Sequence, residues 1–250
     1  MTFIEHLEEL RHRIFICVGT LFACFIFLYS VANEQIRHYF MLPMQETIEG
    51  KGTFQFTSPA EGFLFDLKLA LVVAIFVASP MLFYQFWAFV APALYKKEKK
   101  YVIPFLVFST ILFVGGATFG YFIVFPIGFK FFSQFATQGV ALNPKLNEYF
   151  AFATKLLLAF GFTFELPLIL FFAGRIGLID VKFLNRNRKY AILILFAISA
   201  MFTPPDVISQ VLLAVPLWAL YEFSTLLVWL TQRKKQKTEQ ESDPDSSPAG

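Results

Sequence analysis

The sequence predicts an all-α membrane protein that crosses the bilayer several times. Of its 250 residues, 57% are hydrophobic and only 16% are charged, whereas about 25% are charged in an average soluble domain. The apolar residues gather in long runs. Runs of this length are typical of transmembrane helices.

Six apolar runs define the predicted spans. They cover residues 14–32, 63–91, 101–129, 149–173, 190–203 and 207–230. Arg11 and Arg13 precede the first run, as in a signal peptide. That run is long, however, the residues before it are acidic, and five more runs follow it. We therefore interpret it as a retained helix.

The second span has a defined start and an unusual length. Ser58-Pro59-Ala60-Glu61 fits a capping box with proline at the first helical position, and Thr2 to Glu5 fits another at the N-terminus. A helix from Ser58 to residue 91 is about 50 Å long, which exceeds the ~30 Å hydrocarbon core. We expect it to project from the bilayer or to bend at Pro80.

The fifth span is too short to cross a bilayer unaided, because 14 residues make about 21 Å of helix. Thr203-Pro-Pro-Asp206 then turns the chain directly into the sixth span. Exposed backbone at membrane depth needs protein or water around it. We therefore expect a concave bundle with short fifth and sixth helices.

The remaining segments complete the predicted organisation. Residues 33–57 form an external loop with room for cap helices, and residues 180–189 look like a basic interfacial segment. Residues 1–231 form the six-helix transmembrane domain. Residues 232–250 are polar and contain serine and proline, which predicts a disordered tail.

Lysine and arginine residues fix the predicted orientation. Fifteen of the 21 lie at the N-terminus, in residues 92–100 and 174–189, and in the tail, whereas the opposite loops hold four. Positive residues concentrate on the cytoplasmic side of membrane proteins. Both termini are therefore predicted to be cytoplasmic.

Composition also excludes several classes of function. The net charge of +3 is too small to indicate a nucleic-acid partner. The three histidines and two cysteines have no metal-ligand spacing, and no catalytic triad or phosphate-binding loop is evident. We expect no metal, no cofactor and no enzymatic activity.

Two acidic segments lie on the predicted cytoplasmic side. Glu5, Glu8 and Glu9 precede the first span, and Glu98 stands among four lysines. Carboxylates at such a surface can bind guanidinium groups. The N-terminal acids can equally be neutralised within their own helix by Glu9–Arg13 and Glu8–His12 pairs, and Glu98 can simply relieve repulsion between the lysines.

Two carboxylates are predicted within the membrane. Glu165 lies well inside the fourth span, and Glu222 lies at a similar depth in the sixth. An ionised carboxylate at that depth is costly, so Glu165 should face protein or water, or be protonated. The pair can line one cavity, or Glu222 can be an interfacial residue.

With these residues in view, the chain resembles the TatC family of twin-arginine protein translocase subunits from His6 to about Tyr221. Five segments carry the resemblance in order along the chain. They are His6-Leu-Glu-Glu-Leu-Arg11, Ser79-Pro80, Tyr84-Gln85-Phe-Trp87-Ala-Phe-Val-Ala-Pro92-Ala-Leu-Tyr95, Phe160-Gly161 with Phe164-Glu165-Leu-Pro167, and Thr203-Pro-Pro-Asp206 with Gln210.

The resemblance implies a non-enzymatic receptor in the cytoplasmic membrane that binds the twin-arginine signal peptides of folded cargo proteins. It implies that Glu9 and Glu98 contact the two arginines and that Arg11 and Phe89 shape the same surface. Glu8 departs from the family pattern and can share the role of Glu9. Transport would draw on the proton-motive force.

The resemblance also implies partner subunits with a single span, of the TatA and TatB kind, in a hetero-oligomer with several copies. Thr203 and Gln210 match positions of polar contact with such helices, next to Asp206 of the same motif. Glu165 would meet the signal peptide or a partner side chain. The alternatives are a proton-coupled small-solute transporter that uses Glu165 and Glu222, and a membrane scaffold without a ligand.

Overall fold

The computed structural model describes residues 3–48, 58–90, 102–133, 145–203 and 207–242, and these residues are almost entirely helical. The predicted all-α fold is confirmed. The chain divides into two compact units, Met1–Gly161 and Phe162–Gly250. The predicted domain boundary between residues 231 and 232 stays a prediction.

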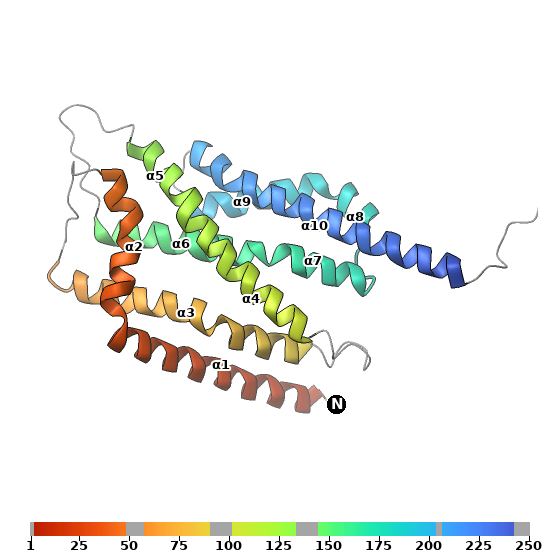
Figure 1. The fold of residues 1–250 in the computed structure, drawn as a ribbon, viewed down its shortest axis with the longest axis horizontal. Coiled ribbons are helices and arrows are strands. Elements are labelled where there is room, and N and C mark those ends of the chain that lie inside the picture. The colour runs from red at the N-terminus through yellow and green to blue at the C-terminus, as the bar shows by residue number, and fades with distance from the viewer. Residues whose placement is uncertain (1–2, 49–57, 91–101, 134–144, 204–206, 243–250) are drawn as a thin grey trace, which may run out of the picture. The chain divides into compact units, whose positions relative to one another are not determined.

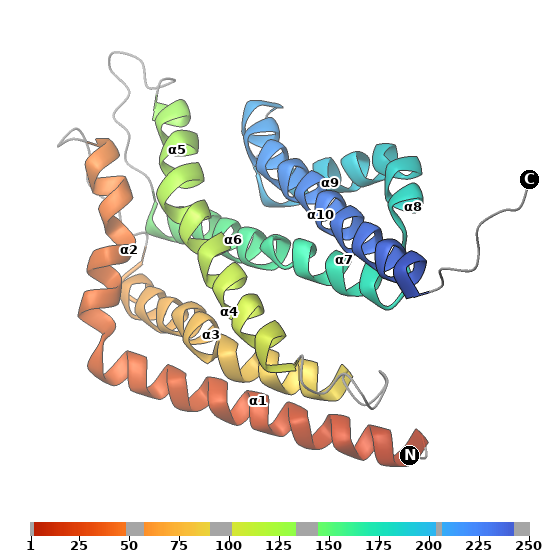
Figure 2. The ribbon, with the colours of Figure 1, turned by 45° about the vertical axis from the view of Figure 1, so that its right-hand side comes forward.

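The first unit is built on two long antiparallel helices, α1 (Phe3–Val31) and α3 (Glu61–Val90), which lie side by side (Figures 1 and 2). The helix α2 (Asn33–Ile48) connects them, in the loop that was expected to hold cap helices. The rest of the unit comprises α4 (Val102–Phe119), the π-helix η3 (Gly120–Val124), α5 (Phe125–Ser133) and most of α6 (Leu146–Phe164). Since α1 and α3 run in opposite directions, the start of α1 and the end of α3 lie at the same end of the unit.

Proline residues interrupt two of these helices, and nearby hydroxyl groups bond the carbonyl groups that they release. Pro80 cannot donate to the carbonyl of Phe76, and the Ser79 hydroxyl donates to that oxygen at 2.6 Å. In the same way Pro43 of α2 cannot donate to the carbonyl of Tyr39, which accepts a hydrogen bond from the Tyr121 hydroxyl. The bend expected at Pro80 stays a prediction.

An aromatic cluster holds α2 against the other helices of this unit. Phe40 packs on Phe65 of α3 and on Tyr149 and Phe150 of α6, with ring centroids 5.4 to 6.0 Å apart. The Tyr149 hydroxyl also donates to the carbonyl of Phe40 at 2.6 Å. Offset and edge contacts between rings at these separations stabilise a core beyond the area that they bury.

The third and fourth predicted spans contain irregular turns that hydropathy did not indicate. The third changes to π-helical hydrogen bonding at Gly120, where a Cβ atom would lie 2.9 Å from the Phe160 ring. The fourth breaks at Glu165 between α6 and α7 (Leu166–Arg175). Pro167 follows the break and has no N–H to donate to the preceding turn, which explains why the helix restarts there.

The second unit comprises α7, α8 (Val181–Arg186), α9 (Arg188–Phe202) and α10 (Val207–Ser242). The short fifth span is confirmed, because α9 has only 15 residues. The sixth helix is not short: α10 has 36 residues and stays helical past residue 231, where the disordered tail was expected to begin. One helical hydrogen-bond ladder continues from the apolar residues into the polar ones. The predicted concavity stays a prediction.

Among the residues that the structure describes, five segments are long and apolar enough to cross a membrane. They are Ile4–Val31, Glu61–Phe89, Ile103–Lys130, Leu146–Arg175 and Gln210–Arg233. Helix α9 falls below that length, as its 14-residue apolar run predicted. The chain is therefore a multi-pass membrane protein.

The pairing of α7 with α10 depends on a glycine. A Cβ atom at Gly174 would lie 2.8 Å from Cγ1 of Val228, a stiff β-branched side chain that is fully buried. We expect Gly174→Ala to lower the free energy of unfolding by about 1–2 kcal/mol, because overpacking outweighs the better helix propensity of alanine. Thermal unfolding in detergent measures this loss. Gly115→Ala is the control, since a Cβ atom there meets nothing within 4 Å, and equal shifts for the two variants would contradict the packing argument.

Candidate functional site

Five side chains meet where the start of α1 lies beside the end of α3, and we call them the α1–α3 end cluster: His6, Glu9, Arg13, Gln85 and Phe89. Arg13 donates to Oε1 of Glu9 from Nε at 3.0 Å and from Nη2 at 2.6 Å. Its Nη1 donates to Oε1 of Gln85 at 2.9 Å. The rings of His6 and Phe89 stack with centroids 4.4 Å apart.

Helical spacing explains the cluster. His6, Glu9 and Arg13 follow one another at steps of three and four, so they lie on one face of α1. Gln85 and Phe89 are four residues apart on α3 and face them. Gln85 is 5% exposed, so its amide is a fixed hydrogen-bond partner that holds the Arg13 guanidinium in place.

The two carboxylate oxygens of Glu9 differ in their hydrogen bonding. Both hydrogen bonds from Arg13 go to Oε1, whereas Oε2 is buried and accepts no hydrogen bond within the described residues. Nδ1 of His6 lies 3.9 Å from Oε2. A carboxylate has about four lone-pair sites, so Glu9 can accept a second donor without releasing Arg13.

Of the two ion pairs that were expected to neutralise the N-terminal helix, one is present among the described residues. The Glu9–Arg13 pair forms, but among the ion pairs of the described residues there is no Glu8–His12 pair. Glu8 is exposed, and so is Arg11, whose guanidinium lies 5.6 Å from the centroid of the Phe15 ring. The structure thus brings Glu9 and Phe89 together and leaves Glu8 and Arg11 outside the cluster. Glu98 lies outside the described residues.

The second unit holds the predicted intramembrane residues. Glu165 is 6% exposed at the break before α7, and its backbone carbonyl accepts from the N–H of Ile169 at 2.9 Å. Glu222 of α10 accepts a hydrogen bond from Arg188 at the start of α9, at 2.8 Å. This ion pair favours an interfacial role for Glu222 over a place in a proton-binding cavity.

The polar residues around the turn between α9 and α10 bond within the unit. The Thr203 hydroxyl donates to the carbonyl of Ser199 at 2.9 Å, and Nε2 of Gln210 donates to the carbonyl of Phe196 at 3.0 Å. Gln210 therefore ties α10 to α9. Asp206 lies outside the described residues. Among the described residues, no three His, Cys, Asp or Glu side chains are grouped so that they can hold a metal ion.

Comparison with known proteins identifies the family. Residues 5–216 match the model of the family described as Sec-independent protein translocase protein (TatC). The chain belongs to the TatC family. It is 44% identical over 98% of its length to the TatC protein of Desulforapulum autotrophicum, 90% of which is covered. The TatC protein of Haemophilus influenzae is 40% identical, with 97% of this chain and 94% of the relative covered.

Solved structures agree with the TatC assignment. The crystal structure of a TatC protein described as the twin-arginine translocase receptor matches with a TM-score of 0.82 and 37% identity. The match covers 91% of this chain and 99% of the other. The chain is accordingly a component of a protein translocase.

The structure of this TatC protein adds two residues, Arg13 and Gln85, that the sequence analysis did not assign to the site. Arg13 was weighed only as a neutralising partner of Glu9, and Gln85 was only a letter in a matching segment. Their contact joins positions 72 residues apart. In the sequence, the signal that could have drawn attention to Gln85 was a polar amide among the aromatic residues Tyr84, Phe86 and Trp87.

Proposed function

We propose that this chain is the receptor subunit that binds the twin-arginine signal peptides of folded cargo proteins, at its cytoplasmic end. One observation carries the proposal: Arg13 holds Oε1 of Glu9, whereas Oε2 has no hydrogen-bond partner among the described residues, within a cluster that also contains the stacked rings of His6 and Phe89. The similarity to a protein described as the twin-arginine translocase receptor supports it.

The chemistry of the guanidinium group suits this arrangement. An arginine side chain presents a planar fork of donors that binds carboxylates through two hydrogen bonds. Because Arg13 already uses Oε1 of Glu9, an incoming arginine has only Oε2 there and needs a further acceptor. Glu98 is our proposed second acceptor, which accounts for two carboxylates and two arginines.

The proposed setting is the cytoplasmic membrane, with both termini in the cytoplasm. The excess of lysine and arginine at the N-terminus, in two of the loops and in the tail supports this orientation. It puts the α1–α3 end cluster on the side where newly folded cargo is found. Energy would come from the proton-motive force, as the family resemblance implies.

Partner subunits complete the proposal. Single-span helices of the TatA and TatB kind would pack along α9 and α10, where Met201 and Val207 expose 75% and 73% of their surface. Because Thr203 and Gln210 are engaged within the unit, their proposed contact with a partner uses their remaining acceptor atoms. Glu165 would face the signal peptide or a partner, and Asp206 belongs to the same proposed contact region.

The proposal predicts that the chain distinguishes arginine from lysine in its ligand. Fluorescence anisotropy of the purified protein should show at least tenfold weaker binding when a twin-arginine signal peptide is replaced by its twin-lysine version, since lysine lacks the fork. Equal affinities would overturn arginine recognition, and no binding of either peptide would overturn the receptor role. Solute uptake by liposomes containing this chain alone would support the transporter instead.

A further inference from the structure

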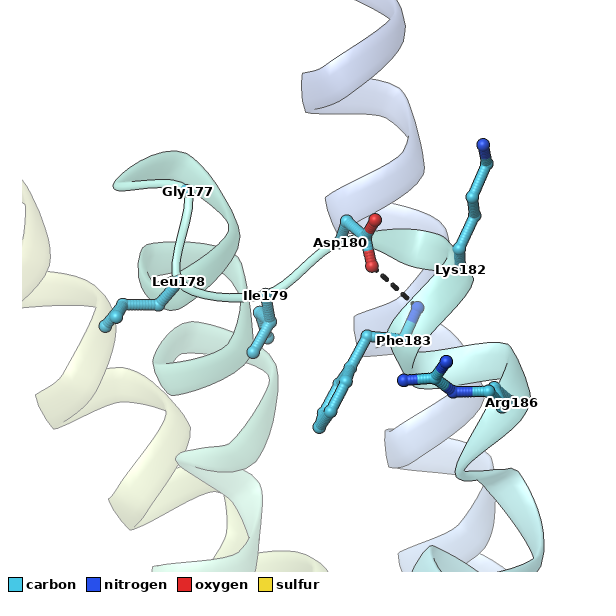
Figure 3. A pocket seen from close by; sticks show the side chains of 7 residues that line it. All are labelled: Gly177, Leu178, Ile179, Asp180, Lys182, Phe183 and Arg186. Atoms are coloured by element: carbon cyan, nitrogen blue, oxygen red, sulfur yellow. Dashed lines mark hydrogen bonds between the residues drawn. The ribbon is translucent and has the colours of Figure 1, made fainter.

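A pocket in the second unit lies at the level where two membrane spans end. It opens between α8 and the loop after α7, has a volume of about 500 Å³, and is shown in Figure 3. The α7 span ends at Arg175, and the α10 span ends at Arg233. Gln232 joins the two ends, because its side chain accepts from the N–H of Val181 at 3.3 Å and donates to the carbonyl of Ile179 at 3.4 Å. The pocket therefore lies at the boundary between hydrocarbon and water.

The sequence builds this loop in a defined conformation. Gly177 has φ of +80° and ends α7 in a Schellman motif, with hydrogen bonds from Leu178 N to Ala173 O at 2.9 Å and from Gly177 N to Gly174 O at 3.2 Å. Asp180 then caps α8, since its Oδ1 accepts from the N–H of Phe183 at 2.6 Å. Both walls of the pocket are thus fixed by backbone geometry.

The pocket combines basic and apolar side chains. Figure 3 shows the Arg186 guanidinium turned toward the space beside Phe183, whereas Lys182 extends past Asp180 in another direction. Within the described part of the chain neither Lys182 nor Arg186 has a hydrogen bond or an ion pair. Leu178 and Phe183 expose 74% and 46% of their surface, and covering these side chains with an acyl chain would remove apolar surface from water.

The surroundings of the pocket are also basic. Arg188 and Lys189 lie in the first turn of α9 after α8, Arg233 follows Gln232 on α10, and Glu222 pairs with Arg188. Among the described residues, Asp180 is the one acidic side chain that lines the pocket, and its hydrogen bond to Phe183 occupies one oxygen. The excess of positive charge suits an anionic head group, since basic pockets at this level of a membrane protein bind such lipids.

We propose that this pocket binds one anionic phospholipid. Arg186 binds the phosphodiester, Lys182 at the rim of the pocket adds electrostatic attraction, and an acyl chain lies against Leu178 and Phe183. The bound lipid fixes the short α8 and the end of the α10 span, near Arg233, at the membrane interface. This inference is independent of signal-peptide recognition, since it uses no residue of the α1–α3 end cluster.

Native mass spectrometry of the purified protein, titrated with phosphatidylglycerol or phosphatidylcholine, tests the site. Phosphatidylglycerol should bind more tightly, and the double variant Lys182→Gln/Arg186→Gln should weaken its binding about 25-fold, or about fivefold for each basic group lost. The control variant Lys130→Gln/Lys145→Gln loses the same charge from the first unit and should retain the affinity. Equal losses in the two double variants would overturn the proposal.

A gain of affinity gives a test that misfolding cannot imitate. Asp180→Asn keeps an oxygen to cap α8 but removes the negative charge of the one acidic residue among the described residues that line the pocket. It should bind phosphatidylglycerol about fivefold more tightly, and an unchanged or lower affinity would contradict the site. Inorganic phosphate at the same concentration should not displace the lipid; if it does, the pocket is a free-phosphate site and the lipid proposal is wrong.

Discussion

Replacing Glu9 by glutamine is expected to lower the affinity for a twin-arginine signal peptide by about 10- to 100-fold. One hydrogen bond between charged groups contributes about 1.5–3 kcal/mol, which corresponds to that range. The loss has a second source here. Arg13 stays fixed by the buried Gln85 side chain, so the variant leaves an uncompensated guanidinium that repels the incoming arginine. Anisotropy titration with a labelled signal peptide measures the change.

Glu8→Gln is the matched control for this prediction. It removes the same charge one residue earlier, from an exposed side chain outside the α1–α3 end cluster. We expect less than a threefold change, because an exposed charge without a fixed partner contributes little. If the two variants lose affinity equally, general attraction by the acidic helix explains binding, and Glu9 has no special role. Unchanged thermal unfolding of both variants ensures that binding alone is compared.

Hydropathy predicted which segments are helical but not how their backbones are interrupted. The third predicted span contains the π-turn at Gly120, and the fourth contains the break at Glu165. Both are changes of hydrogen-bond register that leave the apolar pattern intact. The residue at the π-turn must also be small, because a Cβ atom at Gly120 would lie 2.9 Å from the ring of Phe160, which is 40 positions away in the chain. No window of neighbouring residues contains that information.

The candidate site was predicted only in part, because some of its contacts join residues that are far apart in the chain. The i, i+4 spacing of Glu9 and Arg13 indicated their ion pair, and family resemblance pointed to Glu9 and Phe89. Spacing could not indicate that Gln85 holds Arg13, since that contact depends on how α1 and α3 are aligned. Glu222 shows the same limit: its depth left a shared cavity and an interfacial position both open, and its ion-pair partner Arg188 lies on another helix.

The largest expected loss of stability comes from Glu61, a carboxylate that is only 2% exposed. Its Oε1 accepts from the N–H of Asn147 at the start of α6, at 3.1 Å, and its Oε2 accepts from the N–H of Ser58 before α3, at 3.4 Å. The second contact is the reach-back half of the predicted capping box. One negative charge thus serves the N-terminal ends of two helices, where the helix dipole favours it.

Glu61→Ala should lower the free energy of unfolding by about 3–5 kcal/mol, because it removes two hydrogen bonds to a charged acceptor, each of which contributes about 1.5–3 kcal/mol. Glu61→Gln should lose less, since its amide oxygen still accepts one of the two bonds. Thermal unfolding in detergent measures both changes. Glu148→Ala is the control at the same end of α6: its side chain is 73% exposed and pairs with Lys145 at 3.5 Å, so it should cost less than about 1 kcal/mol. Similar losses for Glu61→Ala and Glu148→Ala would mean that the capping carboxylate does not join α3 to α6.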